Sequence, residues 1–316
     1  MRAPNLFSLM LDRLLYGLVR GVLALMRLLP LRALALLGQA GGLLAWALDR
    51  RHRRVAIENL TAAFGEELSP REIRALARLN FRRIGEAYAC AARTALMSDA
   101  AVRRVLEVTH PERLHPGDPR LPPNRILAVG HFGNFEIYAR WAQWVPPFKF
   151  ATTYRALNQP ALDRVLQELR QRSGCLYFER RTQMRALQRI MKGQPLMLGF
   201  LADQHAGQRG LRLPFFGREC STNPSPAVFA LRYQCPLHVC ICYRVGLARW
   251  RIENSEIIPT HDADGPRSVA DIMRDVNRAY EEAIRRDPAN WFWVHRRWKG
   301  GGRPVESKSS PTPPTA

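Results

Sequence analysis

The sequence has few acidic residues for its size. Its 316 residues include 48 Lys and Arg but only 27 Asp and Glu, which gives a formal net charge of +21. An excess of this size predicts an anionic partner: nucleic acid, anionic lipid headgroups or an acidic carrier protein. Hydrophobic residues make up 47% of the chain, enough for the core of one large domain or two small ones.

The sequence also lacks motifs that define several other classes of protein. Its six cysteines include no C-x-x-C pair, and several lie in apolar segments. We therefore expect reduced core cysteines, with no metal site and no cofactor. The absence of G-x-S-x-G argues against the acyl-enzyme route of serine hydrolases. A basic nucleic-acid-binding protein is a non-enzyme alternative, but no nucleic-acid-binding motif occurs and the cations are spread along amphipathic helices, so we expect no nucleic acid.

The first 48 residues have neither the order of a signal peptide nor an uninterrupted apolar run of about 20 residues. Arg13, Arg20 and Arg27 recur every seven residues, and leucines fall on the opposite side of the same helix. This pattern predicts helices at 1–48 that lie in the membrane interface. Two alternatives stay open from the residues alone: a tilted or composite span over residues 14–48, and a pair of core helices.

Beyond this segment, strand and helix patterns alternate. Strand-like runs occur at 125–130, 148–155, 194–203, 236–245 and 249–258, and helical patterns at 69–96, 159–174, 183–193 and 268–288. The alternation predicts an α/β fold, a sheet flanked by helices on both faces, within a domain at 49–300. The polar tail at 301–316 has nothing to bury, and we expect it to be disordered.

One short motif, HFGNFE at 131–136, combines types of residue suited to proton transfer. On one helix, His131 and Glu136 would lie about 140° apart and could not meet. Across a turn that starts at Gly130, with Asn134 capping the next helix, the Glu136 carboxylate would reach the imidazole and fix its tautomer. This predicts a pair that activates a substrate hydroxyl. The alternative is a turn histidine and a solvated acid.

With this motif the sequence resembles the bacterial lipid A biosynthesis acyltransferases, a family of the lysophospholipid acyltransferase superfamily. The likeness runs from about residue 10 to residue 300. Besides HFGNFE, five ordered segments carry it: RRVAIENLTAAF at 53–64, TYRALNQPALDRVLQELRQRSG at 153–174, LADQHAG at 201–207, LPFFGRECST at 213–222 and DPANWFWVHRRWKG at 287–300.

The resemblance implies a glycerolipid-acyltransferase-like fold and an N-terminal membrane-associated helical segment on the cytoplasmic side of the cell inner membrane. It implies an acyl thioester donor, acyl carrier protein or acyl-CoA, and a glycolipid acceptor at an anionic membrane surface. By matching position, His131 would be the general base and Glu136 its partner. Substrate-binding positions would be Asn134, Arg155, Asp203 and Gln204. Related enzymes that acylate phosphatidylinositol mannosides or lysophospholipids stay open as alternatives.

Several of these residues also have purely structural interpretations. Arg155 could be a solvated cation at a strand end, and Asp203 could cap the loop after its apolar strand. Phe215 and Phe216 are more typical of a core than of an acyl channel. The three tryptophans at 291, 293 and 298 could form an interfacial belt or pack inward.

Overall fold

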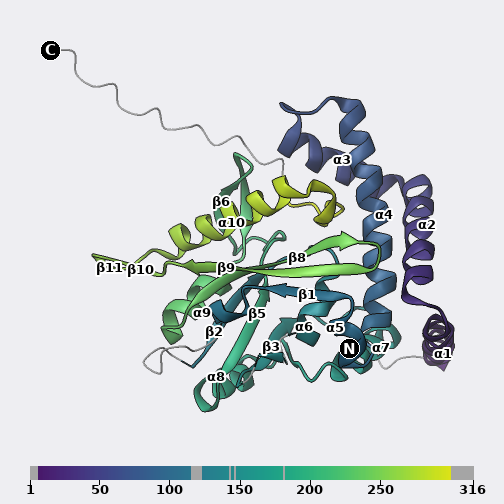
Figure 1. Ribbon diagram of the computed structural model, residues 1–316, viewed down its shortest axis with the longest axis horizontal. Helices are drawn as coiled ribbons and strands as arrows, with labels where there is room; N and C mark the ends of the chain where they lie inside the picture. Colours follow the sequence, from purple (N-terminus) through teal and green to yellow (C-terminus); the bar gives the residue numbers. More distant parts are fainter. Residues whose placement is uncertain (1–5, 115–122, 142–143, 146, 181, 300–316) are drawn as a thin grey trace.

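The computed structural model describes residues 6–114, 123–141, 144–145, 147–180 and 182–299. It has a central sheet with helices on both faces, which confirms the predicted α/β fold class (Figure 1). The seven strands of this sheet lie in the order β1-β9-β8-β2-β5-β3-β4. Their bounds are β1 Leu106–Thr109, β2 Arg125–Val129, β3 Lys149–Tyr154, β4 Leu176–Glu179, β5 Leu196–Leu201, β8 Leu237–Gly246 and β9 Arg249–Ile258.

Neighbouring strands of this sheet are parallel except for β8 and β9, which form an antiparallel pair. The central strands β2 and β5 are almost entirely buried. Both sequences, RILAV and LMLGFL, are nearly continuous apolar runs, as expected for parallel strands covered on both faces. Alternate residues of β2 belong to two separate core clusters, one on each face of the sheet.

Helices and two small hairpins complete the domain. The helices that follow the N-terminal pair are α3 Arg50–Phe64, α4 Pro70–Thr94, α5 Asp99–Arg103, α6 Tyr138–Trp141, α7 Pro160–Gln171, α8 Met184–Gly193, α9 Ser225–Tyr233 and α10 Val269–Arg286. Single 3₁₀ turns are η1 Pro111–Leu114, η2 Phe135–Ile137 and η4 Pro288–Asn290. The hairpins are β6 Leu211–Phe215 with β7 Arg218–Thr222, and β10 His261–Asp262 with β11 Gly265–Pro266.

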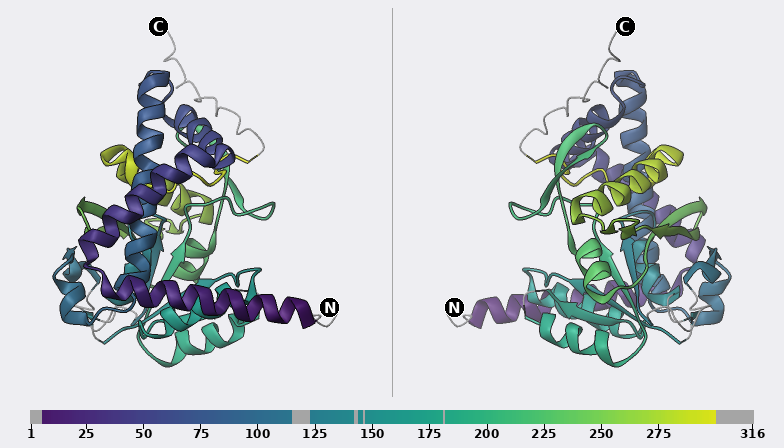
Figure 2. Two further views of the ribbon diagram at one scale, coloured as in Figure 1. Left: turned by 90° about the vertical axis from the view of Figure 1, so that its right-hand side faces the viewer. Right: turned by 90° about the vertical axis from the view of Figure 1, so that its left-hand side faces the viewer.

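The N-terminal helices α1 (Leu6–Leu28) and α2 (Leu31–Leu48) lie on one side of the molecule, with α1 running across its lower part (Figure 2). Glycines bring α2 close to α4: a Cβ on Gly42 would lie 2.1 Å from the carbonyl oxygen of Phe81. Much of the remaining surface of both helices is exposed and apolar; Leu14 and Leu44, for example, are 69% and 60% exposed. This exposure argues against the interpretation of the pair as ordinary core helices, although α2 packs on α4.

Of the described helices, α2 alone has the length and apolar composition that a membrane crossing requires, and 17% of it is buried. Helix α2 lies within the segment 1–48 that was predicted to associate with a membrane. Its exposed leucines could contact lipid whether the helix crosses the bilayer or lies along it. Association of residues 1–48 with a membrane stays a prediction.

Most predicted elements are confirmed, within a few residues at their ends. Ser69 and Glu72 form a capping box at the start of α4, and the side chain of Ser268 caps α10. The helix predicted at 159–174 ends earlier, at Gln171. The tail at 301–316 lies outside the described residues. Strand β4, helix α9 and the β6–β7 hairpin were not among the predicted elements.

Three sets of side chains discussed in the sequence analysis can also be placed. All six cysteines are free and buried, as expected. Phe215 and Phe216 belong to the core. Trp291 and Trp293 are buried, and the Trp298 ring packs against the same core while its Nε1 donates to the carbonyl of Phe215. The tryptophans therefore pack inward, and the alternative of an interfacial belt is wrong.

Candidate active site

His131 and Asp203 lie side by side at the carboxyl edge of the central sheet. Strands β2 and β5 are parallel neighbours, and their last residues, Val129 and Leu201, are register partners. The pairing continues one residue past the end of β5, because the N–H of Ala202 donates to the carbonyl of Val129 at 3.1 Å. Each strand therefore presents, two residues beyond its end, a polar side chain to the same spot, which is where ligands bind in open α/β sheets.

The carboxylate of Asp203 holds His131 through two hydrogen bonds. His131 Nδ1 lies 2.8 Å from Asp203 Oδ1, and the main-chain N–H of His131 donates to Oδ2 at 2.9 Å. Trp291 Nε1 also donates to Oδ2, at 2.7 Å. Because an ionised carboxylate only accepts, Nδ1 of His131 carries the proton in this pair and Nε2 is left as the basic nitrogen.

Asp203 is fully buried, yet it is held in its ionised form. Burial by itself would raise its pKa, but the charge and hydrogen bonds of His131, together with the bond from Trp291, outweigh burial and leave the pKa of Asp203 below its ordinary value. The carboxylate is thus a fixed negative charge behind the imidazole. Such a charge orients the ring and stabilises the imidazolium form.

Two glycines shape the loop that carries His131. A Cβ on Gly130 would lie 2.5 Å from the ring of Phe132 and 3.3 Å from Cγ of Asp203. Gly133 has a φ of +49°, and a Cβ there would lie 2.8 Å from the carbonyl oxygen of Cys242. The first glycine leaves room for the His131–Asp203 contact, and the second allows the left-handed turn that follows.

The predicted pairing of His131 with Glu136 is not the one in the structure. Glu136 instead accepts from Arg170 on α7, at 2.7 Å from Nη2 and 3.4 Å from Nε. The reason is geometric: the chain turns sharply at Gly133 into η2, and Asp203 from the adjacent strand already occupies Nδ1. Asp203 was predicted near the site, but as a substrate-binding residue. Its buried carboxylate is fully engaged by the protein.

The other predicted substrate-binding residues lie in different surroundings. Asn134 is buried and its side chain donates to Thr94 Oγ1 at 3.2 Å rather than capping η2, so the predicted cap is wrong. Gln204 is half-buried, and its main-chain carbonyl accepts a hydrogen bond from Arg297. Arg155 is exposed just beyond β3, and its side chain has no ion pair or hydrogen bond within the described residues. The hydrogen bonds and ion pairs of the described residues therefore do not join Asn134, Gln204 or Arg155 to the His131 side chain.

The C-terminal segment after α10 closes the site from behind. Phe132 and Trp291 form an isolated antiparallel bridge, and Gly133 N–H donates to the carbonyl of Asn290 at 3.0 Å. Arg297, buried completely, donates to the carbonyls of Gln204 and Ser221. Neither Trp291 nor Arg297 is among the site residues predicted from the sequence. The Trp- and Arg-rich ending could have pointed to them. That these side chains turn inward, however, depends on tertiary packing.

His131 lines a small cavity of about 20 Å³, whose other lining residues include Tyr88, Phe135, Phe292 and Arg83. The ring of His131 lies 4.8 Å from that of Phe135 and 5.9 Å from that of Phe292, measured between centroids. Tyr88 of α4 touches both phenylalanines edge-on. Across the described residues, no group of three His, Cys, Asp or Glu side chains is arranged to hold a metal ion. A basic nitrogen beside an apolar cavity suits proton transfer on a substrate with an apolar part.

An α/β fold with an Asp-oriented histidine at its sheet edge is an arrangement suited to acid–base chemistry. Residues 6–300 match the family model described as bacterial lipid A biosynthesis acyltransferase. The chain belongs to this family, and it is an acyltransferase of lipid A biosynthesis.

Two curated relatives support the same assignment. The chain is 26% identical over 293 residues to a protein named lipid A biosynthesis palmitoleoyltransferase from Escherichia coli (strain K12), covering 92% of each chain. It has the same identity and coverage with a lipid A biosynthesis acyltransferase from Shigella flexneri. The family model covers residues 6–300 and so includes the N-terminal helices, which agrees with the extent of the resemblance found in the sequence.

Proposed function

We propose that the protein transfers a fatty acyl group from an acyl thioester to a hydroxyl group of a lipid A precursor, with His131 as the general base. The observation that carries this proposal is the His131–Asp203 pair beside the aromatic cavity. The pair leaves Nε2 free to accept a proton, and the rings of Phe135 and Phe292 beside the imidazole offer an apolar contact to the reacting end of a substrate.

The reaction follows from this arrangement in one displacement. The acceptor hydroxyl gives its proton to Nε2 of His131 as its oxygen attacks the thioester carbonyl carbon. The new C–O bond forms, the C–S bond breaks, and the departing thiolate takes the proton back from the imidazolium. Asp203 stays ionised throughout and stabilises the positive imidazolium between the two proton transfers. No covalent acyl-enzyme is required.

Glu136 is a positioning residue in this proposal, a role that differs from the predicted one. It lies in the first turn after the His131 loop and is bonded to Arg170, whose guanidinium also stacks near Tyr177 at 5.1 Å. Burial would lower the pKa of Arg170, but the ion pair with Glu136 more than compensates and raises it. We propose that this ion pair positions the catalytic loop against α7.

The substrates account for the basic composition. An acidic acyl carrier protein, or acyl-CoA with its phosphates, would supply the thioester, and the glycolipid acceptor would lie in an anionic membrane surface. We propose that residues 1–48 hold the enzyme at the cytoplasmic side of the inner membrane and that residues 49–300 form the acyltransferase domain. Arg155, exposed beyond β3, is a candidate contact for a donor or acceptor phosphate. Asn134 and Gln204 would support the site indirectly, through their hydrogen bonds to Thr94 and Arg297.

Mass spectrometry of lipid A tests this function in cells. A strain that lacks the gene is complemented with the wild-type protein or with His131→Ala. We expect wild-type cells to contain lipid A with one more acyl group than cells that carry His131→Ala, and equal amounts of both proteins in the membrane fraction. Identical lipid A in the two strains would contradict the proposed reaction. The mass of the added group would also identify the chain length.

A further inference from the structure

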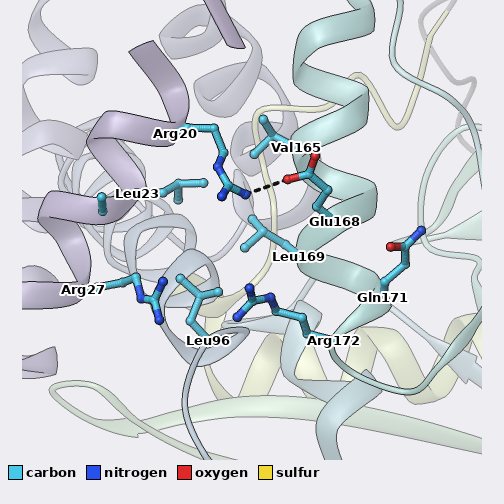
Figure 3. A pocket seen from close by; sticks show the side chains of 10 residues that line it. Arg20, Leu23, Arg27, Leu96, Val165, Glu168, Leu169, Gln171 and Arg172 are labelled. Atoms are coloured by element: carbon cyan, nitrogen blue, oxygen red, sulfur yellow. Dashed lines mark hydrogen bonds and ion pairs between the residues drawn. The ribbon is translucent and has the colours of Figure 1, made fainter. Parts of the chain in front are cut away.

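A second cavity, of about 370 Å³, lies between α1 and α7, outside the His131 site (Figure 3). Helix α1 contributes Arg20, Leu23 and Arg27 to its wall, while Val165, Leu169 and Arg172 line it from α7 and its C-terminal end. It therefore combines an apolar wall with three cationic side chains. Nothing in the proposed acyl transfer at His131 uses these arginines.

The charges in this cavity are not balanced. Its acidic residue, Glu168, accepts from Arg20 Nη1 and from the Tyr16 hydroxyl, each at 2.7 Å. Arg27 and Arg172 have no acidic partner within the described residues. Figure 3 shows their side chains approaching from the two helices with Leu96 between them. Two guanidinium groups that line one cavity without a counter-charge favour a bound anion, and their forked donors match the oxygens of a phosphate.

The position of α1 indicates the source of that phosphate. Its exposed apolar side chains lie on the side of the helix opposite Arg20 and Arg27, at 100° per residue; they include Leu11, Leu14, Leu18, Val22 and Leu25. An interfacial helix buries its apolar face roughly 5–10 Å into the boundary between headgroups and acyl chains. The opposite face then lies at the level of the lipid phosphates.

We propose that the α1–α7 cavity binds the phosphate group of a membrane lipid, with Arg27 and Arg172 as its ligands and Leu23 and Leu169 against the adjoining apolar part. This inference rests on the membrane association included in the proposed function. The lipid is either a phospholipid of the bilayer or the phosphorylated acceptor. Helix α7 links the cavity to the catalytic loop, because Arg170, two residues before Arg172, holds Glu136.

The test compares the full-length protein with two double variants. Arg27→Gln/Arg172→Gln removes the proposed ligands. Arg13→Gln/Arg32→Gln removes the same number of charges from exposed positions of the N-terminal helices that do not line the cavity. Both variants are first checked for wild-type thermal unfolding. One arm measures binding to phosphatidylglycerol vesicles and to phosphatidylcholine vesicles. The other measures binding of a detergent-dispersed lipid A precursor before and after phosphatase treatment.

We expect the cavity variant to bind at least about fivefold more weakly than the control variant in one arm. An excess loss on phosphatidylglycerol vesicles identifies a bilayer phospholipid, and an excess loss that disappears when the precursor is dephosphorylated identifies the acceptor. Equal binding by the two variants in both arms would overturn the proposal. Both arms measure binding rather than turnover. An inactive wild-type protein would therefore refute the proposed reaction but would not test whether this cavity binds a lipid phosphate.

Discussion

His131 and Asp203 occupy equivalent positions, each two residues beyond a register pair in neighbouring parallel strands, and their side chains meet at 2.8 Å. Seventy-two residues separate them along the chain. The sheet therefore sets their distance, and neither loop needs to be long or adjustable. A catalytic pair held by two buried strands is preorganised, which is what proton transfer in a defined geometry requires.

Replacing Asp203 by Asn tests the role of this carboxylate. The amide keeps the shape of the side chain but removes the charge that stabilises the imidazolium, so we expect kcat to fall by about 10²- to 10⁴-fold with a much smaller change in KM. Steady-state kinetics on the purified enzyme measure both constants. Asp264→Asn, an exposed position in the β10–β11 hairpin, is the matched control and should leave both unchanged. A KM effect alone would assign Asp203 to substrate binding instead.

A double-mutant cycle separates the two possible roles of Glu136. If Glu136 acts through Arg170, then Glu136→Gln, Arg170→Gln and the double variant should lose similar activity, since each removes the same ion pair. If Glu136 acts directly on the substrate or on His131, its loss should exceed that of Arg170→Gln, and the effects should add. Measuring kcat/KM for the four proteins gives the coupling energy.

The close approach at Gly130 predicts a cost for the smallest possible side chain. In Gly130→Ala the new Cβ would meet the Phe132 ring and crowd Asp203, so we expect a loss of about 1–3 kcal/mol in the free energy of unfolding, together with reduced activity. Gly193→Ala, at the end of α8, has no heavy atom within 4 Å of the new Cβ and serves as the control. Chemical denaturation of both variants provides the measurement; equal stability would show that the loop relaxes easily.

The environment of His295 predicts a pH dependence of stability. Burial lowers the pKa of His295 to about 4, and its Nε2 accepts from the main-chain N–H of His205. Between the ordinary histidine pKa and about pH 4, His295 is protonated in the unfolded chain but stays neutral in the folded protein. Stability is therefore complete above that ordinary value and falls as the pH decreases, by roughly 3 kcal/mol at pH 4.

Denaturant titrations at several pH values can isolate this contribution. The His295→Gln variant cannot take up the proton, so its unfolding free energy should decrease less than that of the wild-type protein as the pH falls from the ordinary histidine pKa to about 4. Other groups titrate in both proteins, and the difference between the two curves removes them. Parallel curves would mean that His295 is protonated in the folded state.

The sequence predicted the elements of the site better than their pairing. His131 and Asp203 each follow an apolar run typical of a buried strand, so both positions could be placed at strand ends. Which strands are neighbours is decided by the topology: β5 lies beside β2 although β3 and β4 come between them in the chain. The local motif pointed to Glu136 because that acid is close in sequence, whereas the partner comes from the adjacent strand.

The missed β6–β7 hairpin has a different cause. Its turn uses Phe216 and Gly217, both with positive φ. Such turns usually carry Asn or Asp before the glycine, and a phenylalanine hides the signal. Here the ring of Phe216 packs into the core beside Trp293, and this burial offsets the cost of the unfavourable backbone conformation. The inward packing of the tryptophans likewise depends on contacts that no local pattern contains.

The most direct test of the general base is the turnover of purified His131→Ala with a radiolabelled acyl thioester and a lipid A precursor. Without the imidazole, nothing at this position accepts the hydroxyl proton, and we expect kcat to fall by at least about 100-fold while the protein still binds membranes and unfolds at the wild-type temperature. Wild-type turnover by His131→Ala would contradict the central claim that this histidine is the general base.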